Sequence, residues 1–193
     1  HLLVYFDGKK TFQIFQEEQV PVSYQLDTLA SIHECYHKAQ DQDAFQKECV
    51  EALDQRISVW GEEYKKAALN GAAMTRIFCI LTMDRHGQEY KDVLLACAGD
   101  GSRQVQQVLL SVYGGHREWE QEVKTMLASR KQKERQMAVW VLKQWGVEQY
   151  RPELEKALQK EKNKKISEYL QKLLGAEQET VDLEQLAGDC LKN

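Results

Sequence analysis

The stretch RQMAVWVLKQWG, residues 135–146, recurs in outline as RQVQQVLLSVYG at residues 103–114 and as KKISEYLQKLLG at residues 164–175. Each copy ends in glycine, has a large apolar residue directly before it and a basic residue eleven positions before it. Aliphatic residues also stand four or five positions before each glycine. These offsets lie on one face of a helix, because three or four residues make one turn. The sequence predicts three similar helices, each ended by a glycine suited to a left-handed C-terminal position.

A second helical pattern precedes each of these stretches and is opened by an aromatic residue, namely Tyr90, Trp119 or Tyr150. Each opener and the glycine that follows it therefore enclose two amphipathic helices, each with one apolar and one charged face. The repeat period is about 30 residues, which is typical of an α-solenoid, where one unit cannot bury its apolar face alone.

The pattern R-x-x-A-x-x-x-L-x-x-x-G of residues 135–146, with the turn GDG at residues 99–101 one unit earlier, resembles the HEAT repeat. The resemblance covers residues 90–175, and residues 62–89 more weakly. It implies antiparallel helix pairs stacked into a right-handed superhelix, usually with a surface that binds other macromolecules. A fainter similarity is to large bacterial proteins of unknown function that carry HEAT-like arrays, which implies that this chain is a segment of a longer one.

The N-terminal residues depart from the helical pattern. Two runs rich in aromatic and β-branched residues, LLVYF at 2–6 and TFQIF at 11–15, flank DGKK at 7–10. An Asp-Gly pair between such runs favours a β-hairpin. Residues 16–23, which include Pro21, are expected to form a linker.

Between this linker and the repeats, the apolar spacing predicts helices over about 24–40 and 43–60, the second ended by Gly61. A short helix to Leu69, a break at Asn70-Gly71 and a strongly apolar helix through Met83 follow. Because this last helix is apolar on most sides, we expect it to be the most buried in the chain.

The predicted fold is an all-α, right-handed α-α superhelix of HEAT-like helix pairs with a small N-terminal β-hairpin. Its parts are the hairpin and linker (1–23), degenerate helical repeats (24–89), three HEAT-like repeats (90–175), and an acidic capping helix or the start of a further repeat (176–193).

Composition limits the function. The net charge of −4 argues against a protein dedicated to nucleic acid. No uncharged apolar run approaches the roughly 20 residues of a membrane helix. The five cysteines are scattered and include no Cys-x-x-Cys pair, which argues against a zinc knuckle or redox motif and favours a reducing, cytoplasmic compartment.

One pentapeptide could carry metal chemistry. The sequence His33-Glu34-Cys35-Tyr36-His37, if helical, would place two imidazoles one turn apart with a glutamate beside them, as in zinc hydrolases. Glu51 could supply a third ligand. Against this interpretation, Lys38 stands where such enzymes usually have an uncharged residue. The alternative is that His33 faces the core and binds no metal.

Two basic clusters mark the candidate binding surface. They fall in the turns inside successive repeats, so stacking of the repeats should align them along one edge. Residues 116–172 hold 14 Lys and Arg against 9 acids, whereas residues 1–115 hold 11 against 16. The residues predicted to bind are Arg130, Lys131, Lys133, Arg135, Lys160, Lys162, Lys164 and Lys165.

The sequence thus predicts a non-catalytic protein-binding or scaffold segment of a larger cytoplasmic protein, with no cofactor and no metal. Its partner is expected to be another protein or another segment of the parent chain, and an acidic or phosphate ligand would suit the basic edge. Two alternatives stay open: a zinc-dependent hydrolase using His33, Glu34 and His37, and a HEAT-like nucleic-acid-binding or DNA-repair module.

Overall fold

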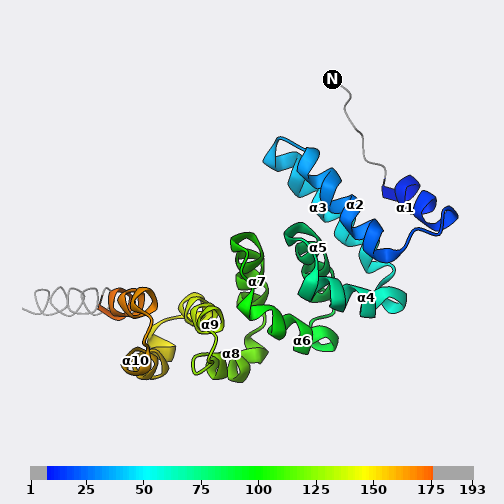
Figure 1. The fold of residues 1–193 in the computed structure, drawn as a ribbon. Helices are drawn as coiled ribbons and strands as arrows, with labels where there is room; N and C mark the ends of the chain where they lie inside the picture. The colour runs from blue at the N-terminus through cyan, green and yellow to red at the C-terminus, as the bar shows by residue number, and fades with distance from the viewer. Residues whose placement is uncertain (1–7, 176–193) are drawn as a thin grey trace, which may run out of the picture. The chain divides into compact units, whose positions relative to one another are not determined.

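The computed structural model describes residues 8–175, and all regular structure within them is helical (Figure 1). The elements in chain order are α1 (Gly8–Glu17), α2 (Val22–Cys35), α3 (Ala39–Asp54), α4 (Ile57–Asn70), α5 (Ala73–Asp84), α6 (Gly87–Ala96), η1 (Cys97–Gly99), α7 (Arg103–Gly115), η2 (Arg117–Trp119), α8 (Glu120–Met126), α9 (Gln132–Trp145), η3 (Glu148–Tyr150) and α10 (Arg151–Lys160). Residues 164–175 form the last helix of the described part of the chain. The all-α class is confirmed.

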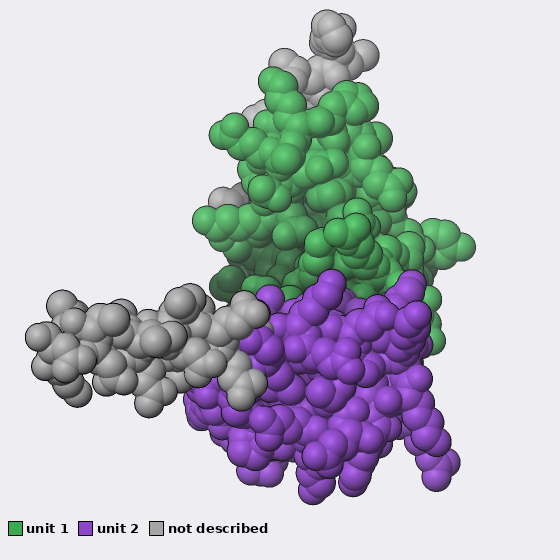
Figure 2. All heavy atoms as spheres, turned by 90° about the vertical axis from the view of Figure 1, so that its left-hand side faces the viewer, with its two compact units in different colours: residues 1–112 green, residues 113–193 purple. Residues whose placement is uncertain are grey.

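The chain forms two compact units, residues 1–112 and residues 113–193 (Figure 2). The boundary falls inside α7. Between residues 8 and 175, no helix has both the length and the apolar character needed to cross a membrane.

The predicted N-terminal β-hairpin is wrong, because α1 occupies its second strand. Residues 2–6, the first predicted strand, lie outside the described residues. Phe12 and Phe15 are three residues apart, so a helix places both on one face, where they are buried with their rings 5.6 Å apart. A strand would instead have turned them to opposite faces. Ile14, between them, is 56% exposed. The packing of this apolar face against α3 stabilises the helix and outweighs the local preference of these residues for a strand.

Helix α5 forms the centre of the first unit. It packs against α2, α3, α4 and α6, and its buried residues include Phe78, Ile80 and Met83. Because its neighbours surround it, even Thr82 is buried, and its hydroxyl donates to the carbonyl of Phe78 at 2.7 Å within the helix. The expectation of a deeply buried helix in this position is confirmed.

Gly61 does not end a helix, contrary to the sequence prediction. It lies inside α4 and is buried. A Cβ added there would overlap the hydroxyl of Tyr90, a buried residue of α6, and would come within 3.4 Å of the ring carbon that bears it. Glycine is required here because α4 and α6 approach closely at this point. The helix boundary that the sequence placed at Gly61 lies instead at the Gln55–Arg56 turn.

The repeat register of the second unit agrees with the sequence. In α9, Leu142 and Trp145 are buried while Lys143 and Gln144 are exposed. Two of the aromatic residues that open the pairs, Trp119 and Tyr150, are also buried. Each is the last residue of a short 3-10 turn that leads into α8 or α10. Of the three repeat glycines, Gly146 has a positive φ of 126°, which favours glycine, whereas Gly114 lies within the last turn of α7.

Two arginines, at the start of the second and third helix pairs, each donate to a carbonyl of the second helix of the same pair. Arg117 Nη2 donates to the carbonyl of Trp145 at 2.7 Å, and Arg151 Nη1 donates to the carbonyl of Leu174 at 3.4 Å. Trp145 is the last residue of α9, where carbonyls have no intrahelical donor. The positive guanidinium group of Arg117 also suits the negative end of the α9 dipole.

The contact between Gly61 and Tyr90 leads to a prediction. Alanine is favoured over glycine in a helix interior by about 1 kcal/mol, but overpacking of a core costs roughly 1–3 kcal/mol. Gly61→Ala should therefore lower the free energy of unfolding, measured by urea denaturation. Adding Tyr90→Phe, which removes the overlapping oxygen, should recover stability relative to Gly61→Ala alone. A Gly61→Ala protein as stable as the parent would show that α4 and α6 do not approach as described.

Candidate functional site: a basic cavity in the second unit

The first wall of the site is the turn between α8 and α9, which is organised by Ser129. Its hydroxyl donates to Glu134 Oε2 at 2.5 Å, and its oxygen accepts the backbone N–H of Lys131 at 3.1 Å. Lys131 Nζ also pairs with Glu134 at 2.9 Å. Short-range bonds of a serine with the following residues favour a turn that leads into a helix, and α9 begins at the next residue.

The opposite wall is the end of α10 and the turn that follows it. Asn163 caps the last helix, because its Oδ1 accepts the backbone N–H groups of Lys165 at 3.0 Å and Ile166 at 3.2 Å. The backbone N–H of Asn163 in turn donates to Glu161 Oε1 at 2.8 Å. These bonds fix the backbone between Glu161 and Lys165.

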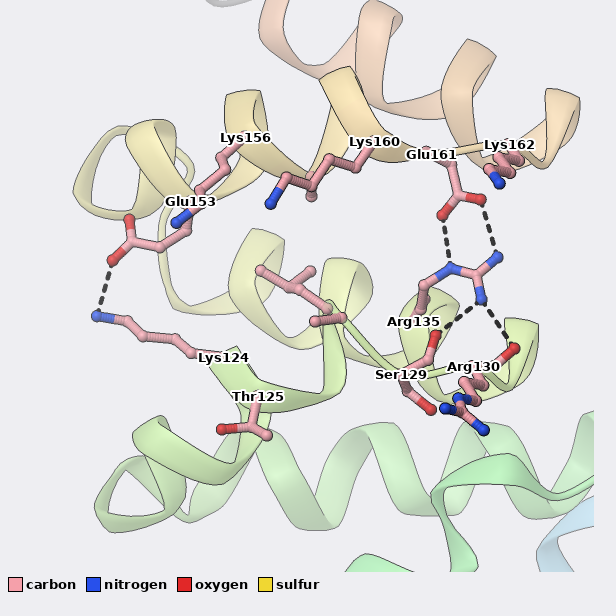
Figure 3. A pocket seen from close by; sticks show the side chains of 13 residues that line it. Lys124, Thr125, Ser129, Arg130, Arg135, Glu153, Lys156, Lys160, Glu161 and Lys162 are labelled. Carbon is pink, nitrogen blue, oxygen red and sulfur yellow. Dashed lines mark hydrogen bonds and ion pairs between the residues drawn. The ribbon is translucent and has the colours of Figure 1, made fainter.

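An ion pair between Arg135 and Glu161 joins the two walls (Figure 3). Arg135 Nε donates to Glu161 Oε2 at 2.8 Å, and Nη2 donates to Oε1 at 2.9 Å. The remaining terminal nitrogen, Nη1, donates to the carbonyls of Ser129 and Arg130 at 3.0 and 3.2 Å. The Glu161 side chain is only 4% exposed, so this bidentate geometry is the kind that a buried pair needs.

Between the walls lies a cavity of about 770 Å³. Its volume is within the usual range of ligand pockets. Its lining combines apolar side chains with charged ones, and six of the charged groups are basic while two are acidic. The lining residues are Lys124, Thr125, Leu127, Ala128, Ser129, Arg130, Arg135, Glu153, Lys156, Ala157, Lys160, Glu161 and Lys162.

Two of the six basic groups are neutralised within the protein. Arg135 pairs with Glu161, and Lys124 pairs with Glu120 at 2.6 Å and Glu153 at 2.9 Å. The other four make no ion pair with the described part of the chain, and all four are exposed; they are Arg130, Lys156, Lys160 and Lys162. The cavity is therefore a positively charged opening with uncompensated cations on both sides.

The electrostatics of the acidic lining residues follow from these pairs. The Arg135 hydrogen bonds hold the pKa of Glu161 below its usual range, although burial opposes this. The hydrogen bond from Lys124 likewise lowers the pKa of Glu153, and the hydrogen bond to Glu120, followed by that to Glu153, raises the pKa of Lys124. Both glutamates are thus ionised near neutral pH, and each has a cation of its own.

The structure brings half of the predicted binding residues to this cavity. Arg130, Arg135, Lys160 and Lys162 line it, from the two turns that the repeat register aligned. Four others are not among its lining residues, namely Lys131, Lys133, Lys164 and Lys165. Lys164 faces Glu168 at 3.8 Å instead.

Sequence reasoning missed Lys124 and Lys156. Lys156 precedes Lys160 by four residues on α10, so helical spacing alone places both on one face. Extending the basic cluster backward by one turn would have included it. For Lys124, its position in α8 gives no such indication, because only the packing of α8 against α10 brings it to Glu153.

The helical His-x-x-x-His arrangement that a zinc site at residues 33–37 needs is not formed. Helix α2 ends at Cys35, and Tyr36 has an extended backbone, so His37 lies outside the helix that carries His33. His33 faces the core beside Phe45 and Phe78, with ring centroids 6.2 and 6.0 Å away, and burial lowers its pKa. The described residues contain no cluster of three His, Cys, Asp or Glu side chains suited to a metal ion.

Comparisons of the chain with protein-family models, with curated proteins and with solved structures found no match.

The buried ion pair between the walls leads to a prediction. Arg135→Met leaves the Glu161 carboxylate buried without its partner, and an unsatisfied buried group costs roughly 1–3 kcal/mol, or more when charged. The free energy of unfolding at pH 7 should fall by that amount. Adding Glu161→Gln, which removes the stranded charge, should restore part of it.

The same variant should show a pH dependence of defined sign. Because the folded pKa of Glu161 is lowered, its contribution is present above the unfolded pKa and is lost as the pH falls through the folded value. The difference between parent and Arg135→Met should therefore be largest near neutral pH and shrink in acid. Arg130→Met, an exposed neighbour, should change stability by less than about 0.5 kcal/mol. Equal losses in both variants would contradict a special role for Arg135.

Proposed function

We propose that this chain is a non-catalytic helical module that binds an acidic segment of another protein, or of its own parent chain, at the basic cavity of the second unit. The observation that carries the proposal is the convergence around one opening of four basic side chains that make no ion pair within residues 8–175. Their mutual repulsion is relieved when an anion binds between them.

The lining favours a polypeptide over a small inorganic ion as the partner. Leu127, Ala128 and Ala157 lie beside the cations and offer apolar contacts to neighbouring side chains of a bound segment. The cavity volume, about 770 Å³, also exceeds what one small anion would fill. Binding sites generally combine such apolar surface with a few placed charges.

The lining disfavours a nucleic acid as the partner. Proteins that bind single strands usually present aromatic side chains on which bases stack, and the described residues of this lining include no aromatic one. Residues 1–115 carry 11 basic against 16 acidic side chains, so their net charge does not favour binding of a polyanion.

The wider interpretation, a scaffold segment of a larger cytoplasmic protein, belongs to the same proposal. The cysteines of the described chain are free thiols, and three of them are buried, namely Cys49, Cys79 and Cys97. Burial raises the pKa of all three thiols, which suits unreactive packing in a reducing compartment.

A peptide-binding experiment tests the proposal. Fluorescein-labelled peptides, one rich in Glu with interspersed Leu and one with Lys in place of Glu, are titrated with the protein and followed by anisotropy. The acidic peptide should bind and the basic peptide should not. Because a Debye length is about 10 Å at 0.1 M salt, affinity should fall as salt is added.

Charge reversal at the cavity provides the control. Lys156→Glu with Lys160→Glu should weaken acidic-peptide binding about tenfold or more, since two partly exposed ion pairs of up to about 1 kcal/mol each would be lost. Lys47→Glu with Lys66→Glu makes the same charge change at exposed positions of the first unit and should have little effect. Equal weakening by both pairs of substitutions would show that binding depends only on the net charge of the protein. Tighter binding of a single-stranded DNA than of the acidic peptide would favour the nucleic-acid alternative.

A further inference from the structure

The basic cavity has more positive charge than an acidic residue can neutralise. Lys156 and Lys160 extend from α10 on one side, and Arg130 stands on the turn between α8 and α9 across from them (Figure 3). Lys162 follows on the turn after α10. One carboxylate carries a single charge, so a Glu or Asp side chain bound here would leave most of these cations uncompensated.

The positions of these cations suit an anion with several acceptor oxygens. Lys156 and Lys160 are one helical turn apart and can approach one group together. Arg130, from the opposing wall, offers a planar guanidinium fork that matches phosphate geometry. A phosphoryl group carries about −1.5 to −2 charge at pH 7 and three strong acceptor oxygens, so it can be contacted from both walls at once.

The groups that are already paired prepare the cavity for such a ligand. Arg135 donates to Glu161 and to the carbonyls of Ser129 and Arg130, which fixes the backbone of the α8–α9 turn from which the Arg130 side chain extends. The Glu161 carboxylate accepts from Arg135 and from the backbone of Asn163, so its charge is compensated where it lies. Glu153 is compensated in the same way by Lys124. An anion entering the cavity therefore meets four free cations and no free carboxylate among the lining residues described.

We propose that the segment bound at this cavity carries a phosphoserine or phosphothreonine, whose phosphoryl group lies between Lys156, Lys160 and Lys162 on one wall and Arg130 on the other. The proposal rests on the proposed function, because it names the chemistry of the same partner. The apolar part of the lining, Leu127, Ala128 and Ala157, then contacts residues next to the phosphorylated one. In this arrangement Arg135 and Lys124 are positioning residues, since their charges are satisfied within the protein.

The test uses three labelled peptides of one sequence, in which a central position between Leu and Ala residues is phosphoserine, Glu or Ser. Binding is measured by anisotropy with the whole chain. The phosphoserine peptide should bind about tenfold more tightly than the Glu peptide, because its greater charge engages additional cations. The Ser peptide should bind most weakly.

Changing the pH separates phosphate from carboxylate recognition. The second phosphate pKa is about 6, so lowering the pH from about 7.5 to 5.5 should weaken binding of the phosphoserine peptide several-fold. Glu titrates near 4.3, so the Glu peptide should be unaffected. The two glutamates of the lining, Glu153 and Glu161, stay ionised in this window, because their ion pairs lower their pKa values. Phosphorus NMR should also show a lower phosphate pKa for the bound peptide than for the free one.

Neutral substitutions test which lysines produce the preference for the phosphoserine peptide over the Glu peptide. Lys156→Gln with Lys160→Gln should abolish the difference between the phosphoserine and Glu peptides, whereas Lys47→Gln with Lys66→Gln should retain it. Both pairs are exposed, and melting curves monitor their folding.

Each result supports or overturns a stated proposal. If the phosphoserine and Glu peptides bind equally and both need Lys156 and Lys160, the phosphate inference fails and the proposed function stands. If no peptide binds, both fail. Inorganic phosphate that competes as strongly as the phosphopeptide would identify a free-anion site. Stronger binding to vesicles containing a phosphorylated inositol lipid would identify a headgroup site. Either outcome would overturn the inference.

Discussion

The arrangement of the second unit depends on one buried ion pair. Arg135 and Glu161 come from different helix pairs, and they meet in a position where the glutamate has almost no contact with water. Such a charge is tolerated only when every acceptor finds a donor, and the planar fork of arginine provides two parallel bonds to one carboxylate. Lysine, a single point charge, could not do this and also hold two turn carbonyls. The pair therefore determines both the distance and the orientation of the two basic turns.

This constraint explains how several like charges are kept together at one opening. Cations gathered on separate flexible turns would move apart, because like charges close together repel. Here the turns are tied by Arg135 on one side of the cavity and by Lys124, between Glu120 and Glu153, on the other. The internal ion pairs neutralise Arg135 and Lys124, and the other four basic side chains of the lining remain available to a ligand. The ligand chemistry proposed for the cavity follows from this division between satisfied and unsatisfied cations.

The sequence was most informative where a periodic pattern and the packing agree. The offsets around Gly146 correctly placed Leu142 and Trp145 in the core, because a helix that buries one face must repeat its apolar residues at that spacing. The same register brought part of the basic turns to one cavity, as Arg130 and Lys162 show. It could not indicate which cations would be consumed by internal pairs, since Glu161 looks in the sequence like any charged residue of a solvated turn.

The failures arise where a local signal competes with tertiary packing. The TFQIF run at residues 11–15 has strand propensity, yet Phe12 and Phe15 also suit a helix, and their shared burial decides. Glycine often ends a helix, but Gly61 lies inside one. Glycine is required there because a side chain would overlap Tyr90. The pentapeptide from His33 to His37 has metal-binding spacing only if the helix continues, and the backbone leaves the helix at Tyr36. In the first two cases the deciding partner, α3 or Tyr90, is distant in sequence.

The bonds from Arg117 to Trp145 and from Arg151 to Leu174 have a consequence for how such a chain can grow. In both cases the donor and the acceptor belong to the same helix pair, so a copy of one pair brings these bonds with it. Other bonds join neighbouring pairs, since Trp145 Nε1 donates to the carbonyl of Gly114 in the preceding pair and Arg135 holds the buried Glu161 of the following one. Loss of one pair would leave such a carbonyl or carboxylate without its donor. An array of this type can therefore change its length by one pair only if the new neighbour supplies matching polar partners as well as apolar surface.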